Sequence, residues 1–204
     1  GTIPAGASIT SAGVFTWTPT EAQGPGSYSI TVVVSDGIAT DSETITVQVN
    51  EVNVAPVLGA ISSKTVNELT LLTFTATATD SDIPVQTLTF SLTGTIPAGA
   101  SITSAGVFTW TPTEAQGPGS YSVTVVVSDG SLTASQAVAI QVNEVNVAPV
   151  LGAIGSKTVN ELTLLTFTAT ATDSDIPVQT LTFSLTGTIP AGASITSAGV
   201  FTWT

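Results

Sequence analysis

The sequence contains no cysteine, no methionine and no histidine. Without cysteine, the fold cannot be held together by disulfide bonds. Without histidine or cysteine, the common nucleophile–base pairs of hydrolytic enzymes cannot form, and the preferred ligands of zinc are missing. We therefore expect a protein that is not an enzyme and whose stability comes from packing and hydrogen bonds.

Basic residues are nearly absent as well. The chain has two lysines and no arginine against fourteen acidic residues, and its formal net charge is −12 at pH 7. Such a surface repels phosphate groups, so we expect no nucleic-acid partner and no attraction to an anionic membrane. No apolar run approaches the roughly 20 residues that span a bilayer, which predicts no direct membrane insertion.

Charge of either sign is scarce, because charged residues make up only 8% of the chain whereas hydrophobic residues make up 42%. Serine and threonine must therefore supply most of the polar surface. Threonine suits a pleated, half-buried strand, so the composition favours a folded chain rich in β-structure.

The chain is built from a repeat. The segment GTIPAGASITSAGVFTWT begins at Gly1, Gly94 and Gly187, which gives a period of 93 residues. This period is too long for a solenoid repeat and suits one small domain. The stretch VNEVNVAPVL, at 49–58 and again at 142–151, contains a proline and lacks alternation, which is typical of a linker.

The position of the linkers predicts how the repeats are divided. One complete repeat is expected at 54–146, the C-terminal part of a first repeat at 1–53, and the N-terminal part of a third at 147–204. A slice of a long array would have this organisation. Partial repeats that complement one another between neighbouring molecules would have it too.

Within 54–146, apolar residues alternate with threonine and serine at the period of two that is typical of β-strands, and no segment indicates a helix. The predicted strands are 57–66, 71–79, 86–93, 100–103, 106–111, 119–128 and 132–142. Seven short strands per repeat predict an all-β chain of tandem seven-stranded immunoglobulin-like β-sandwiches. Trp110 and Tyr121 are expected in or near the core.

The acids of the repeat gather at the two ends of the predicted sandwich, because strand direction reverses at each loop. Those at the end that receives the linker are Asp80, Asp82 and Asp129, and those at the opposite end are Glu68, Glu114 and Glu144. Each lower end then faces the upper end of the next repeat. The candidate metal ligands are Glu21, Glu51, Asn53, Asp80, Asp82 and Asp129 at the first junction, and Glu68, Glu114, Glu144, Asn146, Asp173 and Asp175 at the second.

Two interpretations of these acids remain open. Ca²⁺ takes about six to eight oxygen ligands, and a cation would relieve the repulsion among clustered carboxylates. Alternatively, the aspartates are ordinary turn formers that bond to nearby backbone. The turn interpretation does not explain the glutamates, so we expect Ca²⁺ at the junctions between repeats.

Several motifs carry a resemblance to a known family. They are VNEL at 66–69, ATDSD at 78–82, GVFTWTPTEAQGPGSYSVTVVVSDG at 106–130 and the linker VNVAP at 52–56. Over its full 93-residue period, the repeat resembles the cadherin-like modules of large prokaryotic surface proteins and their immunoglobulin-like relatives. The resemblance implies a cadherin-like sandwich, calcium that stiffens the array between successive domains, and an extracellular or cell-surface location.

The sequence departs from that family at two places. Pro112, Thr113 and Glu114 stand where the family has an Asp-Arg-Glu motif, so one acid is missing. Two linker acids are missing as well, although Glu51 lies beside them. We therefore expect one or two calcium sites per junction rather than three.

Three roles agree with these observations. The repeats can form the stalk or fibre of a surface adhesin, the wall of a self-assembled extracellular filament, or a spacer attached to a secreted enzyme. In each role the expected partners are neighbouring repeats of the same chain, together with further copies that associate laterally or end to end.

Overall fold

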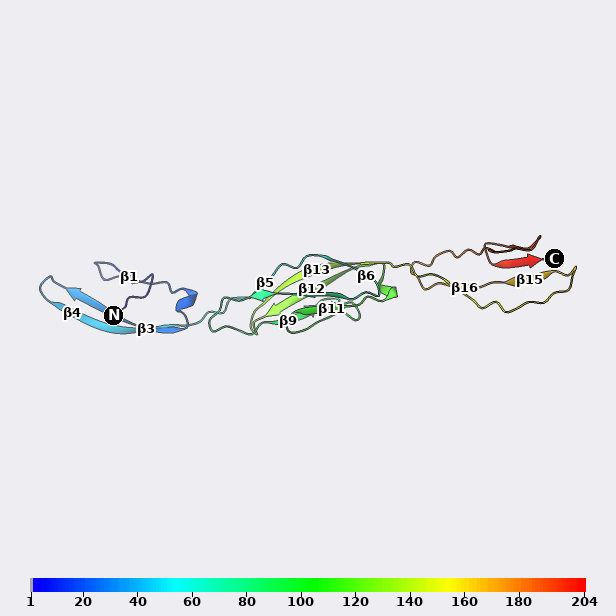
Figure 1. Cartoon of the computed structure of the whole chain (residues 1–204). Coiled ribbons are helices and arrows are strands. Elements are labelled where there is room, and N and C mark those ends of the chain that lie inside the picture. The colour runs from blue at the N-terminus through cyan, green and yellow to red at the C-terminus, as the bar shows by residue number, and fades with distance from the viewer. Residues whose placement is uncertain (1) are drawn as a thin grey trace.

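The computed structural model describes residues 2–204. Three parts follow one another along one long axis, with the N-terminus in the first part and the C-terminus at the far end of the third (Figure 1). In the described residues the only helices are two 3-10 turns of three residues, η1 (Glu21–Gln23) and η2 (Glu114–Gln116). The predicted all-β fold is confirmed.

The strands of the three parts correspond to one another along the sequence. The first part contains β1 (Ser8–Ile9), β2 (Phe15–Thr16), β3 (Gly26–Ser35) and β4 (Thr40–Val49). The second contains β5 (Val57–Leu58), β6 (Lys64–Asn67), β7 (Leu72–Thr75), β8 (Ala78–Thr79), β9 (Thr89–Thr93), β10 (Ser101–Ile102), β11 (Val107–Trp110), β12 (Gly119–Ser128) and β13 (Thr133–Asn143). The third contains β14 (Val150–Leu151), β15 (Leu165–Thr168), β16 (Ala171–Thr172), β17 (Ser194–Ile195) and β18 (Val200–Trp203).

Two sheets of the second part face each other across its core. One has the order β6-β13-β12-β9 and the other the order β10-β11-β7. The long hairpin of β12 and β13 forms the centre of the larger sheet, with β9 antiparallel along β12 and β6 parallel along β13. Because side chains alternate across a strand, Val123, Val125 and Val127 all point inward and are fully buried.

Aromatic rings fill the space between these sheets. Phe108 and Trp110 of β11 are almost completely buried. Phe108 stacks on Phe74 with ring centroids 4.7 Å apart, and Trp110 meets Tyr121 edge-on at 4.9 Å. The prediction that Trp110 and Tyr121 belong to the core is confirmed.

Two of the predicted strands are wrong in their extent, because each changes partner midway. The range 57–66 divides into β5, which pairs with β8, and β6, which pairs with β13. Between β5 and β6, the backbone of Ile61 bonds to the side-chain amide of Gln136 instead of to a neighbouring strand. The N–H of Ile61 donates to Oε1 of Gln136 at 3.0 Å, and Nε2 of Gln136 donates to the C=O of Ile61 at 2.7 Å. The range 71–79 divides similarly into β7 and β8.

The outer parts have the same local structure but fewer strands. The hairpin of β3 and β4 keeps the register of β12 and β13, from Gly26 opposite Val49 to Ser35 opposite Thr40. In the third part, β18 pairs with β15 and β17. The ranges 157–160 and 182–186, which correspond to β6 and β9, are not strands.

Candidate metal-binding junctions

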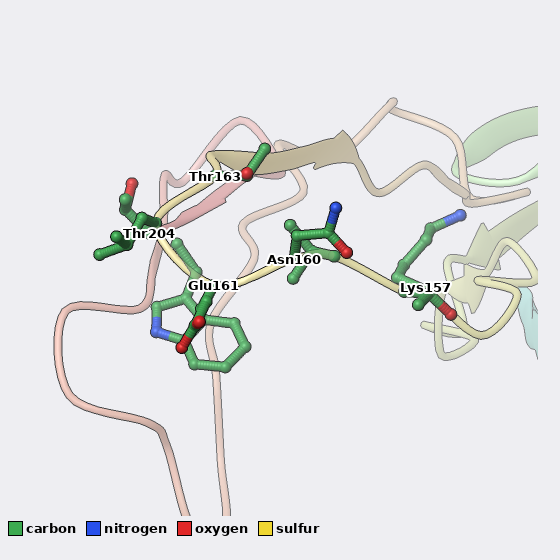
Figure 2. Close-up of a pocket in the computed structure, with 9 residues that line it drawn as sticks. Lys157, Asn160, Glu161, Thr163 and Thr204 are labelled. Atoms are coloured by element: carbon green, nitrogen blue, oxygen red, sulfur yellow. The ribbon is translucent and has the colours of Figure 1, made fainter.

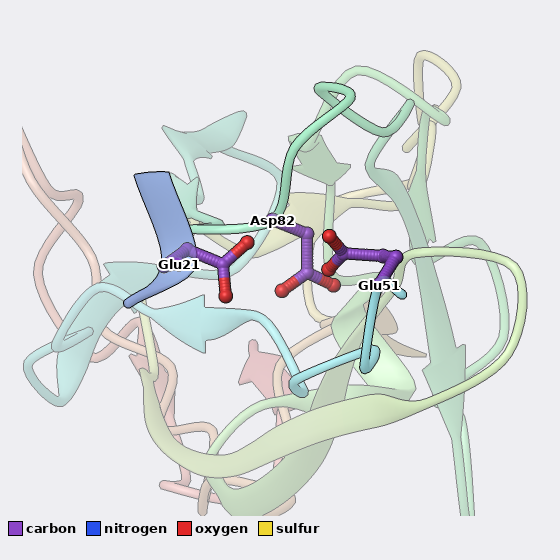
Figure 3. A group of neighbouring side chains, drawn as sticks. All are labelled: Glu21, Glu51 and Asp82. Carbon is purple, nitrogen blue, oxygen red and sulfur yellow. The ribbon is translucent and has the colours of Figure 1, made fainter. Parts of the chain in front are cut away.

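Acids from two repeats converge at the first junction. Glu21 begins η1, Glu51 follows β4, and Asp82 lies in the loop after β8 of the next repeat. One carboxylate oxygen from each lies within 4.8 Å of the others, and Figure 3 shows the three side chains turned toward one another. Asp82 also belongs to a second group with Asp80 and Asp129, which meets the same distance. The first junction therefore has two adjacent acid groups that share one aspartate.

Hydrogen bonds hold the linker against the loop that carries Asp82. The backbone N–H of Val54 donates to both carboxylate oxygens of Asp82, at 3.2 and 3.0 Å. The side-chain amide of Asn53 donates to Oδ2 of Asp129 at 2.9 Å. These bonds fix the path of the linker against the second repeat.

The second junction has equivalent bonds from the N–H of Val147 to both carboxylate oxygens of Asp175, but its group of three acids lies within one repeat. Glu68, Glu114 and Glu144 of the middle repeat form one group, with an oxygen of each within 4.8 Å of the others. The N–H of Ile176, in the third part, donates to Oε1 of Glu114 at 3.1 Å, as the N–H of Ile83 donates to Glu21 at 3.2 Å. A backbone donor from the following repeat therefore meets a glutamate of the preceding one at both junctions.

Some of the carboxylate oxygens buried at the junctions have no hydrogen-bond partner. Glu68, Asp82 and Asp175 are at most 2% exposed. Glu68 accepts a bond from the N–H of Val145 through Oε1, at 3.0 Å, while its Oε2 has no partner. Other buried carboxylate oxygens without a hydrogen-bond donor belong to Glu51, Asp80, Glu144 and Asp173. Buried polar atoms without partners are costly, so these oxygens indicate a missing donor or cation.

Comparison with known proteins identifies the family of this chain. A family model described as "Putative Ig domain" matches residues 1–50 and 55–143, which is more than half of the sequence. The chain belongs to this immunoglobulin-like domain family. No curated protein matches it.

Solved structures similar to this immunoglobulin-like chain include two cadherin fragments. Mouse cadherin-23 EC22-24 has a TM-score of 0.59 and mouse protocadherin-24 EC1-3 a TM-score of 0.52. Each is 17% identical to this chain, and each match covers 98% of it. The match covers 71% of the cadherin-23 fragment and 74% of the protocadherin-24 fragment. At this identity the likeness shows the fold, a tandem cadherin-like sandwich.

Among residues 2–204, no helix has the length and apolar character to cross a bilayer.

Every predicted ligand of the immunoglobulin-like repeats lies at a junction, though not all play the same part. Asn53 and Asn146 use their side-chain oxygens to accept from Gln86 and Gln179, at 2.6 and 2.7 Å. Asp173 accepts from the N–H of Asp175 at 3.1 Å, which is a turn bond. Among the described residues, Asp173 and Asp175 do not belong to a group of three acids.

The glutamines are site residues that the sequence analysis missed. Gln86 also donates to Oδ2 of Asp82 at 3.1 Å, and Gln179 donates to Asp175 at the same distance. Each glutamine lies four residues after its aspartate, beyond a proline. That spacing within one loop is the signal that would have suggested them.

The turn interpretation accounts for part of the site. Asp82 donates its N–H to Oδ1 of Asp80 at 3.0 Å, and Asp129 accepts two backbone N–H groups of its own hairpin turn, from Ser131 and Leu132. Both backbone bonds lower the pKa of Asp129, and the bond from the N–H of Leu132 has the larger effect. No such local bonds explain the glutamate groups.

Crowding changes the ionisation of the glutamates. Burial raises the pKa of Glu51, and the nearby carboxylates of Glu21 and Asp82 raise it further. Burial likewise raises the pKa of Glu144, followed by the charges of Glu68 and Glu114. The pKa of Glu114 is also raised, mainly by burial, although the bond from Ile176 opposes this. The folded chain therefore binds protons at these sites more tightly than the unfolded chain.

This shift predicts the pH dependence of the metal-free protein. A raised glutamate pKa gives a stability contribution that is fully present below the ordinary value of 4.5 and is lost as the pH rises through the raised value. In chelator, we expect the melting temperature to rise as the pH falls from neutral to mildly acidic. Calorimetry across this range checks it. The triple variant E51Q/E114Q/E144Q should show a flatter profile, and an unchanged slope would count against the assignment.

Proposed function

We propose that this chain is a non-catalytic, extracellular repeat module that forms the stalk or fibre of a surface adhesin, with Ca²⁺ bound at the junctions between repeats. The observation that carries the proposal is the presence, at both junctions, of facing acids whose buried oxygens lack partners. A stalk needs successive domains held in line, and a cation shared by two domains would do this.

The donor set fits calcium. All of the candidate side chains offer oxygen, from carboxylates and from the amides of Asn53 and Asn146, and hard oxygen ligands are those that Ca²⁺ prefers. At the first junction, Glu21 and Glu51 would hold the ion from the preceding repeat and Asp82 from the following one. The ion would supply positive charge where the chain supplies none.

The two lysines do not meet this need. The ammonium of Lys64 lies 5.3 Å from the centre of the Phe74 ring and donates to Ser62. Lys157 lies 5.6 Å from the ring of Phe167. Both lysines are therefore engaged with aromatic rings of their own repeats, and neutralisation of the acid groups must come from solution.

Thermal unfolding with and without Ca²⁺ tests the proposal. A ligand that binds only the folded state stabilises it by about 2.7 kcal/mol at a hundredfold excess over Kd. We expect millimolar Ca²⁺ to raise the melting temperature, chelator to lower it, and small-angle scattering to show a straighter molecule when Ca²⁺ is present.

A pair of double variants provides the control. D80N/D82N should lose the calcium-dependent rise at the first junction. D41N/E43Q removes the same charge from exposed positions of β4, away from both junctions, and should keep the rise. The calcium proposal is wrong if chelator changes neither the melting temperature nor the scattering of the unaltered chain.

A further inference from the structure

A glutamine amide lies between two candidate metal ligands of the first junction. Nε2 of Gln86 donates to Oδ1 of Asn53 at 2.6 Å and to Oδ2 of Asp82 at 3.1 Å. Both oxygens belong to the set that the calcium function assigns to an ion. A nitrogen with two such oxygens beside it has the position of a cation that binds both.

The same arrangement occurs one period later. Nε2 of Gln179 donates to Oδ1 of Asn146 at 2.7 Å and to Oδ2 of Asp175 at 3.1 Å. The backbone bonds to the two aspartates correspond as well, since the N–H of Val147 meets both oxygens of Asp175. The bridging amide is therefore a property of the repeat rather than of one junction.

Neighbouring side chains fix the orientation of the Gln86 amide. Nδ2 of Asn53 donates to Oδ2 of Asp129 at 2.9 Å, which leaves Oδ1 of Asn53 for Gln86. Because Asn53 and Asp82 both present oxygens, only the nitrogen end of the amide can bond to the two of them. Its Oε1 is buried and has no donor. One chain of hydrogen bonds thus joins Asp129, the linker, the glutamine and Asp82.

Asp82 has no acceptor position left on the oxygen that the amide uses. Its Oδ2 accepts from the N–H of Val54 at 3.0 Å as well as from Gln86, and a carboxylate oxygen has about two acceptor positions. The Val54 bond belongs to the backbone of the linker, whereas the glutamine is a side chain that can rotate. Gln86 is therefore the donor that must leave before Oδ2 can bind a cation.

This aspartate connects the two acid groups of the first junction. Figure 3 shows its carboxylate with those of Glu21 and Glu51 of the preceding repeat, and it also belongs to the group of Asp80 and Asp129. A donor that occupies Asp82 therefore affects both groups. All of the bonds made by the amide tie the linker to the following repeat, and none of them reaches Glu21 or Glu51.

The lysines do not take the place of this amide. The ammonium of Lys64 donates to Ser62 and lies over the ring of Phe74. Figure 2 shows the ammonium of Lys157 turned away from Glu161, the nearest acid along the chain. The side-chain donors that meet the buried aspartates of the junctions are amides, and an amide is a weaker partner for a carboxylate than a cation.

We propose that the amides of Gln86 and Gln179 compete with Ca²⁺ for the junction oxygens and so set the calcium affinity of the repeat. This inference rests on the calcium function proposed above and concerns how that site is regulated. At low calcium the amide holds the linker on the following repeat. At high calcium the ion takes Asn53 and Asp82, the amide turns away, and the ion joins both repeats. The free energy of the amide bonds is then subtracted from that of ion binding.

Replacing both glutamines by methionine tests the competition, because methionine has a similar length and no donor. We expect Q86M/Q179M to melt at a lower temperature in chelator. In isothermal titration calorimetry of the intact chain, we expect its dissociation constant for Ca²⁺ to fall about 2- to 10-fold, the factor given by one hydrogen bond of ordinary net strength. Weaker calcium binding by this variant would mean that the glutamines support the ligands in both conditions, and would overturn the proposal.

Charged side chains at the same positions extend the test in two directions. Q86K/Q179K places an ammonium against the junction oxygens, so it should melt higher in chelator and lose most of the calcium-dependent rise. Q86E/Q179E places a carboxylate there, so it should melt lower in chelator and bind Ca²⁺ more tightly than the unaltered chain. An equal calcium-dependent rise in both variants would contradict the competition.

The matched control is Q48M/Q141M, whose positions are also separated by one period. Both glutamines are exposed on β4 and β13, and Gln141 bonds to Ser120 and to the C=O of Val142 rather than to an acid. This variant should keep the calcium affinity of the unaltered chain. If Ca²⁺ does not bind the unaltered chain, the calcium function and this inference both fail. If Ca²⁺ binds and Q86M/Q179M behaves like Q48M/Q141M, only this inference fails.

Discussion

Replacing Trp110 by alanine is expected to lower the free energy of unfolding of the second repeat by about 3–5 kcal/mol. Trp110 is 1% exposed and lies edge-on to Tyr121. Its Nε1 donates to the C=O of Ala98 at 3.1 Å, which ties the loop before β10 to the core. Removing the ring leaves a cavity between two sheets, and the Ala98 carbonyl keeps only the bond from the side-chain amide of Gln116 at 3.2 Å. Denaturant unfolding followed by near-ultraviolet circular dichroism measures the loss.

The repeat supplies a matched control in Trp17. This residue has the same local contacts, with Tyr28 at 4.8 Å and the C=O of Ala5 at 3.2 Å, but it is only half-buried because the opposite strands are absent. In the dilute chain, W17A should therefore cost much less than W110A. Equal losses would show that the local cluster, rather than the complete sandwich, determines the stability.

The same comparison shows what the sequence could and could not predict. Alternation of apolar residues with threonine predicted the all-β sandwich correctly. It also predicted strands at 57–66 and 71–79 without their breaks, because a break depends on partners such as Gln136 that are distant in sequence. The ranges 89–93 and 182–186 have one sequence and two structures. Local pattern determines whether a strand can form, and the neighbouring strand determines whether it does.

For the candidate site too, the sequence predicted where the residues lie along the sandwich but not their tertiary surroundings. Reversal of direction at each loop placed the acids at the ends of the sandwich and selected which residues face each other across a linker. It gave no indication that Glu68 would be buried, because an acid in a turn is ordinarily exposed. Glu68 is covered because Gly117 has no side chain and allows the carboxylate to pack directly against the backbone. Such a close approach depends on tertiary structure.

Glu68 also gives the sharpest prediction for calcium, since E68Q should change stability in opposite directions with and without the ion. The glutamine oxygen can still accept from the N–H of Val145, so the fold should be kept. In chelator, loss of one charge beside Glu114 and Glu144 reduces repulsion, and we expect a higher melting temperature. In Ca²⁺, loss of a carboxylate ligand should remove most of the stabilisation of about 2.7 kcal/mol expected at a hundredfold excess of ion.

The matched control is E161Q, which makes the same change at the equivalent position of the third part. Glu161 is exposed in the single chain and has no glutamate neighbours there, so E161Q should melt like the unaltered protein in both conditions at concentrations where the chain is monomeric. Calorimetry on the four combinations of variant and ion separates the two effects. A lower melting temperature for E68Q in both conditions would mean that Glu68 acts only through its hydrogen bond to Val145. A higher melting temperature for E68Q in both conditions would mean that the glutamate group destabilises the fold and that no cation relieves this.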